Sequence, residues 1–316
     1  MEKLISMTII DAHSHLWYTQ DTTWNGKRIS PLPNGRAMFL GEERQMLPPF
    51  MIDGHNTAEV FLSNMDYAQV SAAVIVQEFI DGLQNDYLKE VKAKYPDRFF
   101  CFAMADYLKD GFFEEVRRLL IDDAFPGMAI PGHRLLGRSL LSEEMMQMFK
   151  FMEENGKVLS ITLKDGDDQA AELSEVIEEC PQLKIAIGHL CMSDQPTTPP
   201  WDNPSWLMQV CLALNENVYL ECGGITWLYN TEFYPFPSAI RALKEAADTV
   251  GWEKLMWGSD YPRTITAITY RMSYDFITKS KEISDEAKQL LLGENAQKFY
   301  GFENLIELLY VKNMSE

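Results

Sequence analysis

The chain contains eight short runs of apolar and β-branched residues, separated for the most part by segments with helical periodicity. Strands that alternate with helices are typical of βαβ units built on a parallel sheet. Eight such runs predict an α/β protein whose strands close into a (β/α)8 TIM barrel. The predicted strands are Met7–Ala12, Ser71–Gln77, Phe99–Met104, Gly127–Pro131, Lys157–Leu163, Leu183–Gly188, Asn217–Glu221 and Lys254–Gly258.

Helices are predicted between and after these strands. Asn85–Tyr95 and Asp168–Glu179 have the pattern of crossover helices, and each is followed closely by a proline that would stop a helix. Ser284–Leu292 and Asn295–Tyr300 are predicted as extra helices at the C-terminal end, each followed by a glycine. Because no internal repeat or Pro/Gly-rich linker divides the chain, we expect residues 1–316 to form a single domain.

The segment Trp17–Asn56, which follows the first predicted strand, has no clear periodicity and is rich in Pro, Gly, Trp and Arg. Loops of this length inside compact domains are uncommon and usually functional. We therefore expect a long loop that covers the mouth of the barrel. A mobile surface insertion is the alternative interpretation.

Charge and cysteine content exclude several classes of protein. A net charge of −19 repels nucleic acids and anionic membranes, so neither is an expected partner. No apolar run is long enough to span a bilayer, and no signal-peptide core precedes the first histidines, so a cytoplasmic location is expected. The five cysteines are widely spaced, which fits neither a disulfide framework nor a zinc site. The expected partner is a small molecule, with a homo-oligomer possible.

Reactive side chains gather where the predicted strands end, which is where barrel enzymes carry their active sites. His13 and His15 follow the first strand, His133 follows the fourth, His189 closes the sixth and Asp260 closes the eighth. Alternate residues of an extended segment project to one side, so the imidazoles of His13 and His15 can converge on one ion. Histidines that only satisfy buried hydrogen bonds are the alternative.

The segments IIDAHSHLW, AIGHL and MWGSDYPR resemble the strand-one, strand-six and strand-eight motifs of the amidohydrolase-related family in the amidohydrolase superfamily. The segments YPDRFFCFAMAD, PQLKIAIGHL and LLGENAQKFYGF are similar to its connecting elements, so the resemblance spans nearly the whole chain. That family contains decarboxylases of the aminocarboxymuconate-semialdehyde type, and lactone hydrolases of sugar and aromatic catabolism. The resemblance implies a metal-dependent hydrolase fold but leaves the reaction open.

Transferred to this chain, the family pattern makes His13, His15 and Asp260 metal ligands, with His189 as a further ligand or a catalytic group. Metal-dependent members usually place another histidine at the end of strand five. The matching stretch here, VLSITLKD, offers Ser160, Thr162 and Lys164 instead. Hydroxyls are poor zinc ligands, so a divalent metal, with zinc the first candidate, is expected to be weakly held or absent.

Members of the family that lack this histidine include lactone-cleaving enzymes, some of which work without metal. The favoured hypothesis is therefore a lactonase-like hydrolase, with Asp260 as general base toward water and His189 as the group that polarises the carbonyl or protonates the leaving oxygen. A metal-dependent decarboxylase of an aromatic or muconate-like acid is the second hypothesis. A barrel that only binds a small ligand is the third.

Substrate contacts are expected from arginines, aromatic residues and polar groups at the strand ends. A carboxylate- or hydroxyl-bearing substrate would suit paired charged hydrogen bonds from arginine. The candidates are Trp17, Arg36, Arg44, Gln77, His133, Arg134 and Arg263. Glu78 and Glu221 also end predicted strands and are expected to point toward the mouth.

Overall fold

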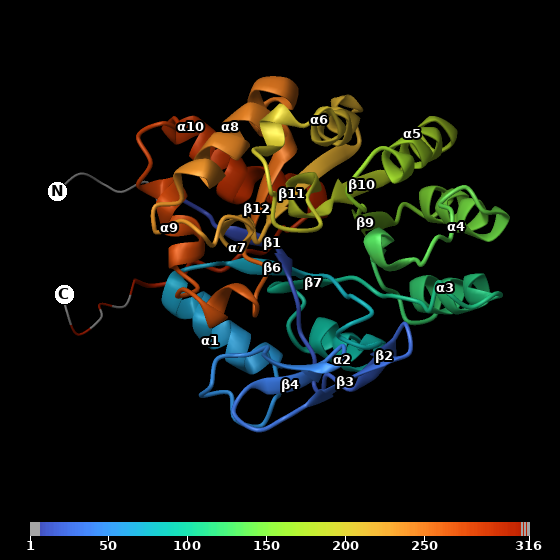
Figure 1. Cartoon of the computed structure of the whole chain (residues 1–316), viewed down its shortest axis with the longest axis horizontal. Helices are drawn as coiled ribbons and strands as arrows, with labels where there is room; N and C mark the ends of the chain where they lie inside the picture. Colours follow the sequence, from blue (N-terminus) through green and yellow to red (C-terminus); the bar gives the residue numbers. More distant parts are fainter. Residues whose placement is uncertain (1–6, 311, 313, 315–316) are drawn as a thin grey trace.

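The computed structural model describes residues 7–310, 312 and 314, and the remaining positions, at the two ends of the predicted domain, lie outside the described residues. Eight parallel strands form its centre, and each overlaps one of the predicted runs (Figure 1). A three-stranded sheet has the order β1-β6-β7, and a five-stranded sheet has the order β12-β11-β10-β9-β8. Their bounds are β1 Ile10–Ser14, β6 Ala72–Ile75, β7 Phe99–Cys101, β8 Gly127–Pro131, β9 Val158–Thr162, β10 Lys184–Ile187, β11 Val218–Gly223 and β12 Leu255–Gly258. The prediction of an α/β fold with parallel sheets is confirmed.

The two sheets meet at isolated parallel bridges rather than in one continuous ladder. Ser14 bridges Tyr261 on one side, and Ala103 bridges Met128 on the other. The single closed ladder expected of a barrel is not formed, because the short strand β7 ends at Cys101 and β1 shifts its register between Asp11 and Ser14. Backbone hydrogen bonds still cross the first junction, from Asp260 N to His13 O at 2.8 Å.

Helices surround the strands (Figure 1). Their bounds are α1 Ala58–Ala68, α2 Asn85–Lys94, α3 Phe112–Ile121, α4 Glu143–Glu154, α5 Asp168–Glu179, α6 Pro204–Cys211, α7 Ile225–Leu228, α8 Pro237–Val250, α9 Met272–Thr278, α10 Asp285–Gln289 and α11 Asn295–Tyr300. The first predicted C-terminal helix is divided, because α10 ends at Gln289 and a π-helical segment continues through Glu294. None of the described helices is both long and apolar enough to cross a bilayer.

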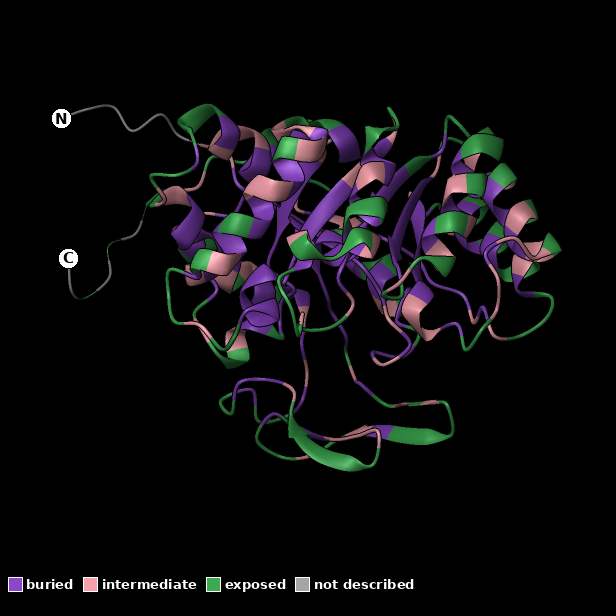
Figure 2. Ribbon diagram, turned by 45° about the horizontal axis from the view of Figure 1, so that its top comes forward, coloured by how far each residue is buried: buried purple, intermediate pink, exposed green. Residues whose placement is uncertain are grey.

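Two clusters of buried apolar side chains form most of the core, a large one and a smaller inner one. Ala12, Val74 and Ala186 belong to the inner cluster, which Phe299 and Tyr300 of α11 extend. The strands are buried along most of their lengths (Figure 2). A solid interior places the polar strand-end residues, and not the strand centres, in contact with a ligand.

The segment between Trp17 and Asn56 is not the irregular loop that the sequence analysis expects. It contains a four-stranded antiparallel sheet, β2 Thr22–Trp24, β3 Lys27–Pro31, β4 Arg36–Phe39 and β5 Glu42–Gln45. Asn25-Gly26, with positive φ at both residues, joins β2 to β3. This pair is a hairpin signal in the sequence, but hydrophobic periodicity does not reveal it. The alternation of polar and apolar residues is weak because much of this sheet is exposed and stands away from the main body (Figure 2).

Candidate active site

Three imidazoles converge at the carboxyl ends of the parallel strands, and each is oriented through its Nδ1 atom. His13 Nδ1 lies 2.8 Å from Glu221 Oε2, and His15 Nδ1 lies 2.9 Å from Asp81 Oδ2. His189 Nδ1 donates to the backbone oxygen of Gly223 at 2.8 Å. With Nδ1 engaged in this way, each ring is left with Nε2 for a ligand, the arrangement found around histidines that bind metals.

Asp260 completes the group from the turn after β12. Its Oδ1 atom lies 3.2 Å from His15 Nε2 and 3.9 Å from His13 Nε2. Its Oδ2 atom accepts a hydrogen bond from the indole Nε1 of Trp227 at 2.5 Å. The backbone of Asp260 is left-handed, with φ of 57°, a conformation that is uncommon outside glycine and concentrates at functional sites.

Two glycines make room for His13 inside the sheet. A Cβ atom at Gly223, the last residue of β11, would lie 2.7 Å from His13 Cγ. A Cβ atom at Gly258, the last residue of β12, would lie 2.6 Å from His13 Cβ. Both approaches are too close for any side chain, so the position of His13 depends on glycine at the ends of two strands distant in sequence.

The pKa values of the titratable side chains in the site are shifted in different directions. Burial alone would raise the pKa of Asp260, but the hydrogen bond from His15 and the charges of the three histidines hold it well below its usual value. Burial lowers the pKa of His15, but the charges of Asp81 and Asp260 outweigh this and raise it well above the ordinary value. Burial and the charge of His13 lower the pKa of His189 to about 3. Asp260 is therefore ionised and His189 is neutral at physiological pH.

The hydrogen bonding of His189 leaves one ring nitrogen free for a ligand or a proton. A neutral ring that donates from Nδ1 to a carbonyl carries a lone pair on Nε2. Such a ring accepts a proton or binds a metal. Both roles expected for His189, polarising the carbonyl and protonating the leaving oxygen, stay predictions.

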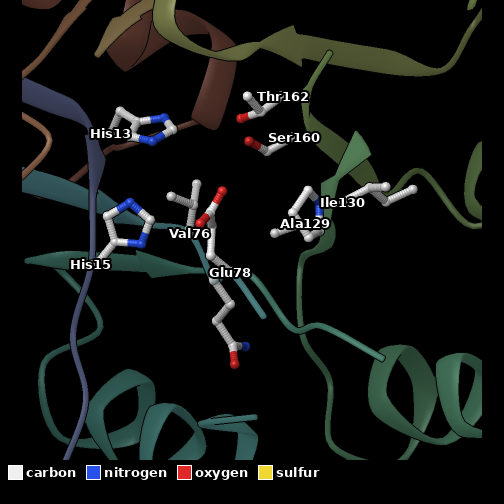
Figure 3. A pocket seen from close by; sticks show the side chains of 10 residues that line it. His13, His15, Val76, Glu78, Ala129, Ile130, Ser160 and Thr162 are labelled. Carbon is white, nitrogen blue, oxygen red and sulfur yellow. The ribbon is translucent and has the colours of Figure 1, made fainter. Parts of the chain in front are cut away.

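The residues present fit a divalent metal ion. One ligand atom each from His13, His15 and Asp260 lies within 4.8 Å of the other two, and all three residues are buried. His13 Nε2 is buried without a hydrogen-bond partner, which is costly unless a ligand satisfies it. A small cavity of about 10 Å³ separates the imidazoles of His13 and His15 from the hydroxyls of Ser160 and Thr162 (Figure 3). The hydroxyls therefore stand where the family pattern leads us to expect an imidazole.

We expect any bound zinc to be lost during prolonged dialysis against a chelator, because the ligand group found among the described residues has three side chains and strand five adds hydroxyls. Elemental analysis before and after dialysis measures this. The Asp260→Asn variant, which removes an anionic ligand, should retain less zinc than the unmodified protein in a parallel sample. Stoichiometric zinc that survives chelation would contradict this prediction.

A cavity of about 560 Å³ opens beside the histidines and brings together most of the predicted substrate contacts. Those that line it are Trp17, Arg44, His133, Arg134 and Arg263. The inserted sheet and the residue after it also line this cavity, through Phe39, Arg44, Gln45 and Met46. The insertion thus forms part of its wall, with its own secondary structure.

Two predicted substrate contacts have other roles. Arg36 does not line the cavity, and its guanidinium pairs with Glu43 at 2.5 Å. Gln77 lines only the small cavity, and its amide is fully engaged: Nε2 donates to Asn85 Oδ1 and Phe102 O, each at 2.9 Å, and Oε1 accepts from a backbone N–H. Gln77 therefore holds the chain that follows β6.

Acidic residues near the site have roles that the strand pattern alone did not assign. Glu221 is completely buried and orients His13, while Asp81 orients His15. Glu78 pairs with His133 Nε2 at 2.9 Å and Arg134 Nε at 3.0 Å. Strand-end positions pointed to Glu78 and Glu221, but Asp81 lies in a turn for which the sequence offers no periodic signal.

Burial alone would raise the pKa of Glu78, but Arg134 and His133 hold it well below its usual range. Glu78 is therefore a carboxylate, and its negative charge is paired with the positive charge of Arg134. An arginine already paired in this way is less available to a substrate carboxylate.

Comparison with known proteins is consistent with this geometry. A solved structure described as a probable 2-pyrone-4,6-dicarboxylic acid hydrolase from Acinetobacter baumannii, with citric acid bound, has 18% identity and a TM-score of 0.69, covering 94% of this chain and 100% of its own. An amidohydrolase from Burkholderia multivorans with bound zinc has 15% identity and a TM-score of 0.64, covering 93% and 99%. The 5-carboxyvanillate decarboxylase from Sphingomonas paucimobilis has 18% identity and a TM-score of 0.57, covering 80% and 86%.

At these identities the structural likeness establishes the fold and not the reaction. A comparison with curated proteins gave no match. The model of one family, described as amidohydrolase, matches residues 10–302, which include His13, His15, His189 and Asp260. The chain therefore belongs to the amidohydrolase family.

Proposed function

We propose that the chain is a hydrolase that opens a lactone or related small cyclic ester, with Asp260 as general base, in a single (β/α)8 barrel domain. The observation that carries the proposal is the position of Asp260. Its Oδ2 is occupied by Trp227, whereas Oδ1 faces the Nε2 atoms of His13 and His15. The carboxylate thus has one oxygen held by the protein and one directed at the reacting groups.

The reaction would begin with a water molecule next to Asp260 Oδ1. Asp260 accepts a proton as the water oxygen bonds to the ester carbonyl carbon, and the ring C–O bond then breaks as its oxygen takes that proton from Asp260. The product is a hydroxy acid, so one lactone and one water are consumed. Without a metal at His15, this residue, whose pKa is raised well above its usual value, can donate a hydrogen bond to the developing oxyanion. A divalent metal at His13, His15 and Asp260 would supply Lewis-acid polarisation of the carbonyl.

The low pKa of Asp260 has a consequence for this mechanism. It ensures that the base is ionised, but it also makes Asp260 a weak proton acceptor. Polarisation of the carbonyl must therefore lower much of the barrier. The convergence of His13, His15 and Asp260 supports this division of roles.

A metal-dependent decarboxylase is the second candidate, because a structural neighbour carries out that reaction. Ser160 and Thr162 disfavour it for this chain, since they stand beside the metal-ligand group where the family pattern has another imidazole. A barrel that only binds a ligand is the third candidate. The buried carboxylates Glu221 and Asp81, which orient His13 and His15, count against it because they support a precise arrangement of reactive groups.

A substrate panel tests the proposal. Purified protein, with and without added zinc, is incubated with muconolactones, sugar lactones, 2-pyrone-4,6-dicarboxylate and 5-carboxyvanillate. We expect ring opening of a lactone, seen as proton release and as a hydroxy acid by mass spectrometry. Carbon dioxide release from 5-carboxyvanillate without any lactone hydrolysis would replace the proposal with the decarboxylase alternative.

A further inference from the structure

Arg263 differs from every other arginine in the described part of the chain. Each of the others lies within 4.0 Å of a carboxylate oxygen, whereas Arg263 forms no ion pair with any described residue. The sequence contains 47 acidic and 28 basic residues, so acidic partners are plentiful. An arginine left unpaired in such an acidic chain keeps its charge available to a ligand.

The surroundings of Arg263 hold it beside the reacting groups. Its guanidinium carbon lies 3.5 Å from the centre of the Trp227 ring, in a cation–π contact. Trp227 is buried, and its Nε1 donates to Asp260 Oδ2. Arg263 and Asp260 both line the cavity of about 560 Å³. One indole ring therefore links an unpaired cation to the proposed general base.

Other arginines of the cavity are already neutralised. Arg134 pairs with the buried carboxylate of Glu78 at 3.0 Å, and Arg44 pairs with Glu42 at 2.9 Å. A substrate carboxylate at either position would compete with a protein carboxylate. Arg263 has no such competitor among the described residues.

Two further charged residues of the cavity lack an ion-pair partner in the described structure, Lys164 and Asp194. Both are exposed, and their charges are opposite in sign. Together they add no net charge to the cavity. Of these unpaired charged residues, Arg263 is the one stacked on the indole that donates to Asp260.

We propose that Arg263, stacked on Trp227, is the subsite that binds a carboxylate of the substrate. This inference rests on the proposed function and narrows its substrate to a lactone whose small ring carries a carboxylate. The planar guanidinium can hold that group with two hydrogen bonds. Because Trp227 also contacts Asp260, binding there places the ester carbonyl of the same ring next to the base.

Binding of two aromatic probes tests the subsite without requiring turnover. Isothermal titration measures the affinity for isophthalate (benzene-1,3-dicarboxylate) and for its neutral analogue isophthalamide. Arg263→Gln should weaken isophthalate binding by about tenfold or more, since a charge-assisted hydrogen-bond pair is lost. It should leave isophthalamide binding unchanged to within about twofold. Arg263→Lys keeps the positive charge but lacks the planar guanidinium that forms two parallel hydrogen bonds. Its affinity for isophthalate should therefore lie between those of the unmodified protein and Arg263→Gln.

Arg241→Gln is the matched control. Arg241 also stacks on a tryptophan, with its guanidinium 4.3 Å from the Trp201 ring centre, but it pairs with Glu245 and does not line the cavity. The Arg241→Gln substitution removes the same positive charge, and it should leave the affinity for both probes unchanged.

The subsite is overturned if Arg263→Gln binds isophthalate as well as the unmodified protein, or if it weakens both probes equally, as a loss of packing would. It is also overturned if the unmodified protein does not prefer isophthalate to isophthalamide. The proposed function can fail on its own. If carboxylate binding depends on Arg263 but the protein opens no lactone, only the proposed reaction is rejected. Lactone hydrolysis that Arg263→Gln leaves unchanged rejects only the subsite.

Discussion

The Asp260→Asn variant is expected to lose kcat by roughly 10²-fold or more on the accepted lactone, with KM changed only a few-fold. Asparagine keeps the volume and one acceptor oxygen, so the hydrogen bond from Trp227 can persist. Its amide nitrogen then faces His15 Nε2, where it cannot take a proton from water or neutralise a cation. Steady-state kinetics and a thermal unfolding curve on the same preparation measure the effect.

Asp86→Asn serves as the control for this substitution. Asp86 is exposed in the first turn of α2, outside the cavity, and its loss should leave kcat unchanged. A structural role for Asp260 has a different signature. If Asp260→Asn lowered thermal stability and left the turnover of the folded enzyme intact, Asp260 would not be the base, and the ligand-binding interpretation would regain support.

Gly258→Ala is expected to remove activity and to destabilise the fold by about 1–3 kcal/mol, the usual cost of forcing atoms into a packed interior. The added Cβ would lie 2.6 Å from His13 Cβ and 2.9 Å from His13 N. Because one of these contacts is to backbone, His13 cannot swing aside without moving β1. Displaced by even a fraction of an ångström, its imidazole no longer meets His15 and Asp260. Thermal unfolding and kcat measure the two consequences.

Gly188→Ala provides a comparison at another glycine that lies close to His13. A Cβ at Gly188 would lie 2.8 Å from Thr162 Oγ1 and 3.4 Å from His13 Cε1. The nearer contact is a hydroxyl at the end of a side chain that can rotate, so the loss of stability should be smaller than for Gly258→Ala. Equal effects from both substitutions would show that the backbone of His13 is not the determining contact.

The positions of the reactive residues were predictable because they depend on local pattern. Apolar runs of strand length locate the ends of the strands, and the ends of parallel strands meet at one edge. The sequence alone therefore predicts that His13, His15, His189 and Asp260 lie in one region. The H-x-H spacing also predicts that His13 and His15 face the same side, as their distances to Asp260 show.

The inserted sheet was only partly predictable. Asn25-Gly26 and Asn34-Gly35 are turn signals, and both residues of each pair adopt positive φ. The strands between them lack the alternation that reveals a sheet, because much of this sheet is not packed against the core. Hydrophobic periodicity records burial, so it is weak where only a few residues of a sheet, here Ile29 and Ala37, are buried.

The order of residues shows which strand ends carry histidine and carboxylate, whereas the charges that remain free are set by how the folded chain pairs them. Arg36, Arg134 and Arg263 have the same chemistry in the sequence. In the folded chain Arg36 is outside the cavity, Arg134 is paired with Glu78, and Arg263 has no acidic partner among the described residues. Ion pairing depends on distances of a few ångströms between residues far apart in sequence, and local pattern contains no information about those distances.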